Sequence, residues 1–244
     1  MNKEKQKNIK FKYYSAKEDK HFLFESFRLV FNKAFDQWYP MKTFNWKYLS
    51  KFSIDSIIQE IIIEDEIVGY RGLWKVNEYA YGYQCIDTCI DPNYQGKGIF
   101  KKSNQHLIKT LGSFYNYPNP KSYPGYLKSG WENHGAMNIY INKISNFEFC
   151  DWSEDFIDWR FCQHPYIKYY KIKLTSGFAV IRYKKNLPVH VESVKHDLNL
   201  EQVKSPFFSF KYALKPSGFK IRNAGMVVVN NFSDPIRSSY FDMI

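Results

Sequence analysis

The chain has 244 residues, of which 44% are apolar and 19% are aromatic, and it carries a formal net charge of +11. This composition supplies enough apolar material for a packed core and excludes a largely disordered protein, and the length allows two modest domains. The lysine-rich start lacks the apolar core of a signal peptide, and no later stretch is long enough to span a bilayer, so we expect a cytoplasmic protein. The four cysteines are then expected to be reduced thiols.

Helical and strand periods alternate through the first half of the chain. In chain order we expect a strand at Ile9–Tyr14, a helix at Lys20–Phe35, a hairpin of Ile57–Ile63 and Ile67–Leu73, a strand at Tyr81–Ile90, a helix that begins near Phe100, a strand at Phe114–Tyr117, and a short helix up to Ser129. Gly130 is placed to cap that last helix. The first half therefore predicts a mixed α/β unit.

A second unit is expected to begin at Phe147, which divides the chain into residues 1–146 and 147–244. Tyr169–Leu174 and Phe178–Tyr183 predict a hairpin, and Met226–Val229 predicts a further strand. Two short stretches of the first half have weak echoes in the second, Leu127–Trp131 in Leu214–Phe219 and Asn45–Tyr48 in Asp158–Phe161. These echoes indicate either a degenerate internal duplication or a chance similarity.

The turn from Asp91 to Phe100 lies between an expected strand and an expected helix and contains two glycines. Glycines let the backbone approach a phosphate closely, the first amides of the helix are unpaired, and Lys97, Lys101 and Lys102 add positive charge. The spacing excludes a Walker loop and lacks the third glycine of a dinucleotide fingerprint. A pyrophosphate site fits this pattern, and the alternative is a turn that uses glycine for its geometry alone.

Two motifs resemble those of the GNAT superfamily of N-acetyltransferases. The first is Ile90-Asp91-Pro92 followed by Gln95-Gly96-Lys97-Gly98-Ile99, which is similar to the coenzyme A loop, with Phe100 in place of a final small residue. The second consists of Asn119, Ser122, Tyr126, Lys128, Gly130 and Trp131 at the family's spacing. The resemblance covers roughly residues 8–146.

This resemblance implies a mixed, mostly antiparallel sheet flanked by helices, followed by a smaller α/β unit. It also implies that acetyl-CoA or another short acyl-CoA is the co-substrate, with main-chain amides on its pyrophosphate and one amide from the end of the strand on the thioester oxygen. The residues expected to contact the co-substrate are Cys89, Ile90, Gln95, Gly96, Lys97, Gly98, Ile99, Phe100 and Asn119.

Catalytic roles follow from the same resemblance. Tyr126 occupies the position from which a family tyrosine protonates the leaving thiolate, and its alternative role is packing against the co-substrate. By strand alternation Tyr83, Cys85, Asp87 and Cys89 should share one face, and Asp87 is the carboxylate there that could act as the base. Asp87 could equally be a structural carboxylate, with water removing the proton. We expect no metal, because no His or Cys pair has ligand spacing.

We therefore expect N-acylation of a primary amine on a small metabolite or an amino sugar, free or nucleotide-linked. The second unit could complete the acceptor cleft or form a homodimer interface. Two alternatives remain open: a binding module that has lost catalysis, and an aminoacyl-tRNA-dependent transferase. Basic residues are spread along the chain and the coenzyme A loop is intact, which disfavours a nucleic-acid partner.

Overall fold

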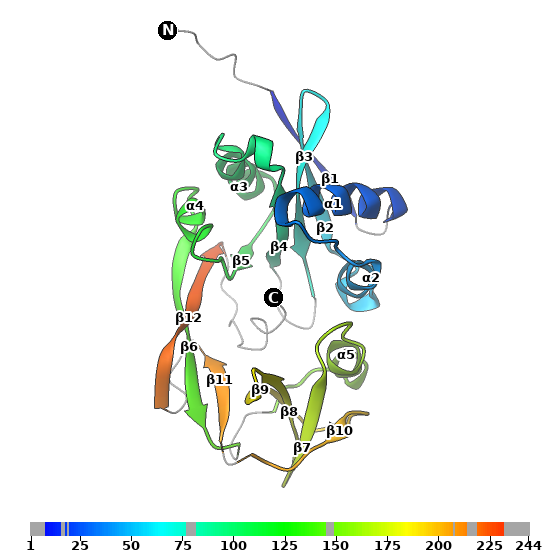
Figure 1. Cartoon of the computed structure of the whole chain (residues 1–244), viewed down its shortest axis with the longest axis vertical. Coiled ribbons are helices and arrows are strands. Elements are labelled where there is room, and N and C mark those ends of the chain that lie inside the picture. Colours follow the sequence, from blue (N-terminus) through cyan, green and yellow to red (C-terminus); the bar gives the residue numbers. More distant parts are fainter. Residues whose placement is uncertain are drawn as a thin grey trace. The chain divides into compact units, whose positions relative to one another are not determined.

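Figure 1 shows the computed structural model, which describes residues 8–15, 18, 20–76, 82–144, 149–206, 208–213 and 219–231. It has the predicted mixed α/β architecture, in which helices flank a mostly antiparallel sheet. The chain divides into two compact units: one contains the described residues up to Asn133 and those from Val228 on, and the other contains His134–Val227. The predicted division after Asn146 lies further along the chain than this observed one.

The sheet of the first unit has the strand order β1-β2-β3-β4-β5-β12. Neighbouring strands are antiparallel, except for β4 and β5, which are parallel. The strands are β1 (Ile9–Ser15), β2 (Ile57–Ile63), β3 (Glu66–Trp74), β4 (Tyr83–Ile90), β5 (Phe114–Asn116) and the end of β12 (Phe219–Asn230). The predicted strands and the β2–β3 hairpin are confirmed, while Tyr81, expected at the start of β4, lies outside the described residues.

The helices of the first unit are α1 (Lys20–Phe35), α2 (Met41–Tyr48), α3 (Ile99–Thr110) and α4 (Tyr123–Leu127). The sequence predicts α1, α3 and α4 but misses α2. The buried side chains of α2 are at positions 43, 44, 46 and 48, so they do not form the single apolar stripe that marks a helix in a sequence. Within the described ranges, no helix combines the length and the apolar character needed to cross a bilayer.

Helices cover both faces of this sheet (Figure 1). Neighbouring residues of β3 show the two sides: the hydroxyl of Tyr70 lies 2.5 Å from that of Ser26 in α1, whereas Arg71 donates to Asn104 of α3 at 2.7 Å. Successive side chains of a strand point to opposite faces. We therefore refer to the α1/α2 face and the α3/α4 face of the sheet.

Burial on both faces explains why β2 is an almost continuous apolar run. Its two buried polar residues each have a partner on their own face. Gln59 accepts a hydrogen bond from Ser103 of α3 at 2.7 Å, and Glu60 accepts one from Tyr70 at 2.8 Å. Each polar group is thus compensated where it is buried.

The second unit is mainly β-structure with the strand order β12-β6-β11-β9-β8-β7-β10. Its strands, besides part of β12, are β6 (Glu132–Asn142), β7 (Tyr169–Leu174), β8 (Gly177–Lys184), β9 (Leu187–Val194), β10 (Glu201–Gln202) and β11 (Ser209–Ala213), and its helix α5 (Glu154–Ile157) continues as a wider turn through Asp158–Cys162. The predicted β7–β8 hairpin is confirmed, and the predicted strand at 226–229 is part of β12. The internal duplication stays a prediction, and residues 214–218 of one echo lie outside the described residues.

Candidate active site

The strands β4 and β5 pair only through their first residues. The paired residues are Tyr83 with Phe114 and Gln84 with Tyr115. In the described part of the chain, no strand pairs with this edge of β4 beyond Gln84, and β5 ends at Asn116. The main chain of β4 from 85 to 90 therefore presents an open strand edge, which can bind an extended ligand through its N–H and C=O groups.

A β-bulge interrupts β4 opposite Arg71. The register shifts by one residue there, so both Asp87 and Thr88 stand opposite Arg71. Asp87 takes the left-handed conformation with a φ of 49°, which is uncommon for a residue other than glycine. Such a bulge bends the strand and redirects its side chains.

The prediction that Tyr83, Cys85, Asp87 and Cys89 share one face is wrong because of this bulge. Cys85 lies in the core cluster on the α3/α4 face, and Tyr83 packs against the same cluster. Asp87 instead accepts hydrogen bonds from α2, on the opposite face. Burial raises the pKa of the Cys85 thiol to about 11, which fits a small neutral core residue.

Three donors surround the carboxylate of Asp87. Tyr39 donates to it at 2.7 Å and Tyr48 at 2.8 Å, while the Lys47 ammonium lies 2.9 and 3.0 Å from its two oxygens. The side chains of Lys47 and Asp87 are each only 13% exposed. Oδ2 thus accepts from all three donors and Oδ1 accepts from Lys47, so Oδ1 is the oxygen with acceptor capacity left for a substrate proton.

The end of β4 turns one amide toward the open edge. The N–H of Asp91 donates to Val68 of β3 at 2.8 Å, and because main-chain groups alternate along a strand, those of Ile90 face the other way. The carbonyl of Ile90 accepts from the Gln95 side chain at 2.9 Å. Cys89 is paired with β3. Of the two residues predicted to supply an amide, Ile90 is thus the one that presents it.

A short 3-10 turn, Pro92–Tyr94, follows β4. Asp91 stabilises its start by accepting from the Asn93 N–H at 2.9 Å, and the N–H of Gln95 donates to the Pro92 carbonyl at 3.2 Å. The backbone N–H of Gln95 thus serves the turn, and its side-chain NH₂ group serves the strand end. The Gln95 N–H, which the sequence predicts as one of the ligand-binding amides, is therefore hydrogen-bonded within the turn. The next amide along the loop is that of Gly96.

Gly96 and Gly98 adopt left-handed conformations, with φ values of 74° and 75°. A Cβ atom at either position would meet nothing within 4 Å, so their conformation, and not close packing, requires glycine. Gly98 is the N-cap of α3 and offers no capping side chain. The first-turn amides of Ile99, Phe100 and Lys101 have no partner within the helix, so they can bind an anion.

The charge around this loop favours a polyanion. The first turn of α3 has no acidic residue and contains Lys101 and Lys102. The ammonium of Lys97 lies 5.2 Å from the ring centre of Tyr94, whose hydroxyl donates to Glu66 at 2.7 Å. The loop, the open helix end and the lysines together fit the pyrophosphate of coenzyme A. No group of three or more His, Cys, Asp or Glu side chains among the described residues could hold a metal ion.

Phe100 points away from the loop and toward α4. Its ring makes an edge contact with the ring of Tyr126, with 5.1 Å between centres, and the guanidinium of Arg71 lies 5.2 Å from its centre. The family's small residue at this position is therefore replaced by a side chain that packs between α3 and α4. The Phe100 ring therefore leaves the uncapped start of α3 open.

A Schellman motif ends the turn that carries Tyr126. The N–H of Trp131 donates to the Tyr126 carbonyl at 3.2 Å, the N–H of Gly130 donates to Leu127 at 3.1 Å, and Gly130 has a φ of 90°. This motif brings the ring of Trp131 against that of Tyr126, with 4.7 Å between centres. The Gly-Trp pair of the second sequence motif thus fixes the position of Tyr126.

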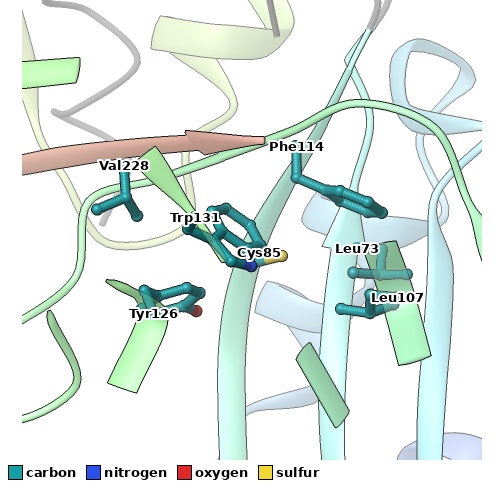
Figure 2. Close-up of a cluster of buried hydrophobic side chains, with 7 residues drawn as sticks. All are labelled: Leu73, Cys85, Leu107, Phe114, Tyr126, Trp131 and Val228. Carbon is teal, nitrogen blue, oxygen red and sulfur yellow. The ribbon is translucent and has the colours of Figure 1, made fainter. Parts of the chain in front are cut away.

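Figure 2 shows Tyr126 within a buried cluster on the α3/α4 face, made of Leu73, Cys85, Leu107, Phe114, Tyr126, Trp131 and Val228. The hydroxyl of Tyr126 accepts a hydrogen bond from the Asn116 side chain at 2.6 Å. Burial raises the pKa of Tyr126 well above its ordinary value, while the charge of Arg71 and the hydrogen bond from Asn116 act in the opposite direction. Tyr126 is therefore a neutral phenol next to the open edge of β4.

Asn119 begins the turn that leads into α4. Its side-chain oxygen accepts from the N–H groups of Lys121 and Ser122 at 3.0 and 2.9 Å. These bonds form an Asx turn. The residue is exposed, and its side-chain NH₂ group, which has no hydrogen bond to the described residues, is the part that can reach a ligand.

Sequence reasoning missed three residues that contact the site. Arg71 and Thr88 lie on the two strands that form the bulge, and Asn116 is the last residue of β5. The available signal for Arg71 was a single charged residue within the stretch 67–74 of β3. Thr88 can be recognised as a site residue only when the bulge is known. Asn116 can be recognised only when its hydrogen bond with Tyr126 is known.

No protein-family model matches the sequence, and no curated protein matches it either. Solved structures do. A GCN5-related N-acetyltransferase from Kribbella flavida has a TM-score of 0.53 at 9% identity, over 91% of this chain and 71% of that protein. A conserved protein of unknown function from Enterococcus faecalis V583, described as a probable N-acyltransferase, has a TM-score of 0.52 at 13% identity, over 77% of this chain and 58% of that protein. The chain therefore has the fold of the GNAT N-acetyltransferases.

Proposed function

We propose that this protein transfers an acetyl or another short acyl group from coenzyme A to a primary amine of a small molecule. The observation that carries the proposal is the continuity of the site: the open edge of β4 leads through the left-handed glycines Gly96 and Gly98 directly to the uncapped start of α3. An extended thioester arm that ends in a diphosphate matches this arrangement. The likeness of the fold to an N-acetyltransferase supports the same function.

In this proposal the diphosphate binds the amides from Gly96 to Lys101, and Lys97 adds charge. The extended arm of the substrate lies along the edge of β4, where Ile90 supplies an outward N–H. The exposed NH₂ group of Asn119 would donate a further hydrogen bond to the arm. Gln95 contributes indirectly, because its side chain holds the Ile90 carbonyl.

The acid and the base would act from opposite faces of β4. Tyr126 belongs to the α3/α4 face and Asp87 to the α1/α2 face. An amine that attacks the thioester from the side of α2 would lose its proton to Asp87 or to water, while the departing sulfur would receive the proton of Tyr126. The outward N–H of Ile90 would stabilise the negative charge that develops on the thioester oxygen.

A panel of amines tests this proposal. The whole chain is mixed with acetyl-CoA or propionyl-CoA and with polyamines, amino acids, amino sugars and nucleotide-linked amino sugars, and the released thiol is measured. We expect release with at least one amine and at least 100-fold less release by Tyr126→Phe, within the range for loss of a general acid. Coenzyme A binding without thiol release from any amine would instead identify a binding module. Activity with aminoacyl-tRNA alone would identify the other alternative.

A further inference from the structure

The two oxygens of the Asp87 carboxylate have different surroundings. Oδ2 accepts from the hydroxyls of Tyr39 and Tyr48 and from the Lys47 ammonium. Oδ1, in contrast, accepts from Lys47 alone among the described residues. Because each carboxylate oxygen can accept about two hydrogen bonds, Oδ1 has room for one more donor.

The Lys47 ammonium has a donor that the protein does not use. A lysine ammonium carries three N–H groups, and its contacts with Oδ1 at 2.9 Å and with Oδ2 at 3.0 Å engage two of them. The part of the chain that the structure describes offers the nitrogen no further acceptor, and the ring centre of Tyr39 lies 5.6 Å away. An unused acceptor on Asp87 and an unused donor on Lys47 therefore lie side by side.

Both members of this pair are held at defined positions. Asp87 is the bulged residue within the open stretch of β4, and Lys47 lies in the last turn of α2, where its carbonyl accepts from the Trp74 indole N–H at 2.6 Å. Burial and the charge of Asp87 raise the pKa of Tyr48 well above its ordinary value, so this phenol stays a neutral donor to Oδ2. The unused acceptor and donor are thus presented together beside the open edge.

The pair is neutral and largely removed from water. The side chains of Lys47 and Asp87 are each 13% exposed, and their opposite charges cancel. A ligand that brought only an ammonium group to Oδ1 would place a second cation beside Lys47. Like charges this close repel strongly where water is largely excluded. A ligand that also brought an anion to Lys47 would keep the site neutral.

Acidic side chains of the neighbouring elements do not provide this anion. Asp91 at the end of β4 pairs with Lys33 of α1 at 3.2 Å, and Glu25 pairs with Arg28 within α1. Glu60 is buried on β2, and β3 lies between it and β4. The compensating anion is therefore expected from the ligand itself.

We propose that the Asp87–Lys47 pair recognises a zwitterionic acceptor, which is an amine that carries a carboxylate close to its nitrogen, as an α-amino acid does. The inference rests on the proposed acyl transfer. The acceptor ammonium binds Oδ1 of Asp87 and its carboxylate binds the third donor of Lys47, so two opposite charges enter the site together. A polyamine lacks the carboxylate and is disfavoured by the charge of Lys47. Lys47 is thereby the residue that determines specificity.

Pairs of amines that differ by one carboxylate test this specificity. Thiol release from acetyl-CoA is compared for alanine and ethylamine, leucine and isoamylamine, and phenylalanine and phenethylamine. In the wild type the amino acid of at least one pair should have the higher kcat/KM, by about 10-fold or more, and Lys47→Met should abolish this preference. Lys47→Arg should keep it. Lys42→Met, which removes an exposed lysine of the same helix, is the matched control and should keep it too.

The possible results separate the specificity from the reaction. Thiol release without such a preference in the wild type, or with the same preference in Lys47→Met, would overturn the role of Lys47 and leave acyl transfer intact. No thiol release from any amine would instead refute acyl transfer, and the binding measurement below would then decide whether the pair recognises a zwitterion.

This second measurement needs no turnover and uses the folded wild-type chain, so it also decides the matter if Lys47→Met does not fold. The lysines are reductively methylated with ¹³C, which preserves their positive charge, and the Lys47 signal is assigned by its loss in Lys47→Arg. With coenzyme A present, glycine should shift this signal, and methylamine, the same amine without the carboxylate, should not. No shift with glycine, or equal shifts with both, would overturn the inference.

Discussion

Phe100 and Gly125 are complementary: a Cβ atom at Gly125 would lie 2.9 Å from Cε1 and 3.0 Å from Cδ1 of the Phe100 ring. Because Gly125 of α4 has no side chain, the ring of Phe100 from α3 can occupy this space. This pairing explains how the chain carries a phenylalanine where the similar coenzyme A loops have a small residue. The ring is accommodated by α4, and the backbone of the loop remains accessible.

Gly125→Ala should therefore destabilise the protein, although alanine is normally the better helix former. The new methyl group would have to displace a ring that also contacts Tyr126, and overpacking of this kind costs about 1–3 kcal/mol. Denaturant unfolding measures the change.

Gly112→Ala is the matched control, because Gly112 is exposed and its added Cβ would meet nothing within 4 Å. It should change the free energy of unfolding by less than about 0.5 kcal/mol. In a Phe100→Leu background the cost of Gly125→Ala should shrink or reverse. An equal cost in both backgrounds would show that Phe100 is not the group displaced.

Local patterns account for the parts of the site that the sequence predicts. Gly96 and Gly98 are required by their own backbone conformation, so they are visible without knowledge of the neighbours. The same holds for Gly130, whose conformation ends the turn that positions Tyr126. The predicted order of strand, glycine turn and helix is confirmed, and it places the predicted anion site at the start of α3.

The remaining parts depend on contacts between distant segments. The bulge at Asp87 arises from pairing with β3 and reverses the face of the following side chains, which no alternation rule can foresee. The helix α2 was missed because its buried residues are selected by tertiary packing. The contacts of Arg71 with Asn104 and Thr88 likewise appear only when α3 and the bulge are in place around it.

Gly72→Ala should disturb the hydrogen bonds that Asp87 accepts from its three donors. The hydroxyl of Tyr48 lies next to Gly72, and a Cβ atom added at Gly72 would be 1.9 Å from that hydroxyl oxygen. We expect a loss of about 1–3 kcal/mol in the free energy of unfolding, because Tyr48 must leave its hydrogen bond with Asp87. In a Tyr48→Phe background, which lacks the clashing oxygen, the same substitution should cost less. Additive costs would contradict this account.

Asp87→Asn tests the proposed base. If Asp87 accepts the amine proton, kcat should fall by about 100-fold while coenzyme A affinity stays unchanged. Tyr39→Phe is the comparison, since it removes one hydrogen bond to Asp87 and keeps the carboxylate. Equal and small effects of both substitutions on kcat would assign Asp87 a structural role and leave proton removal to water.

His190 should make the protein sensitive to acid. Burial, aided by the charge of Lys211, lowers the pKa of His190 from 6.5 to about 3. Between these values the unfolded chain binds a proton that the folded chain does not, so stability should fall as the pH decreases from 6.5 toward 3, by about 1.4 kcal/mol per pH unit for this group.

Urea unfolding at several pH values measures this dependence. His190→Gln should flatten the slope between pH 6 and 4. Ser193→Ala, which removes the hydroxyl 3.1 Å from the imidazole but keeps the imidazole itself, should retain it. An unchanged slope in His190→Gln would show that other groups control the acid sensitivity.

The central claim, that the loop before α3 binds coenzyme A, is tested most directly by calorimetric titration of coenzyme A into the wild-type chain, Gly98→Glu and Gly112→Glu. Both substitutions add the same charge at an exposed glycine with no neighbour within 4 Å, but Gly98 caps α3 in a left-handed conformation and Gly112 lies beyond its other end. We predict binding by the wild type and by Gly112→Glu, and a loss of about 100-fold or more in affinity for Gly98→Glu. No binding by the wild type, or equal affinities for the two variants, would contradict the account.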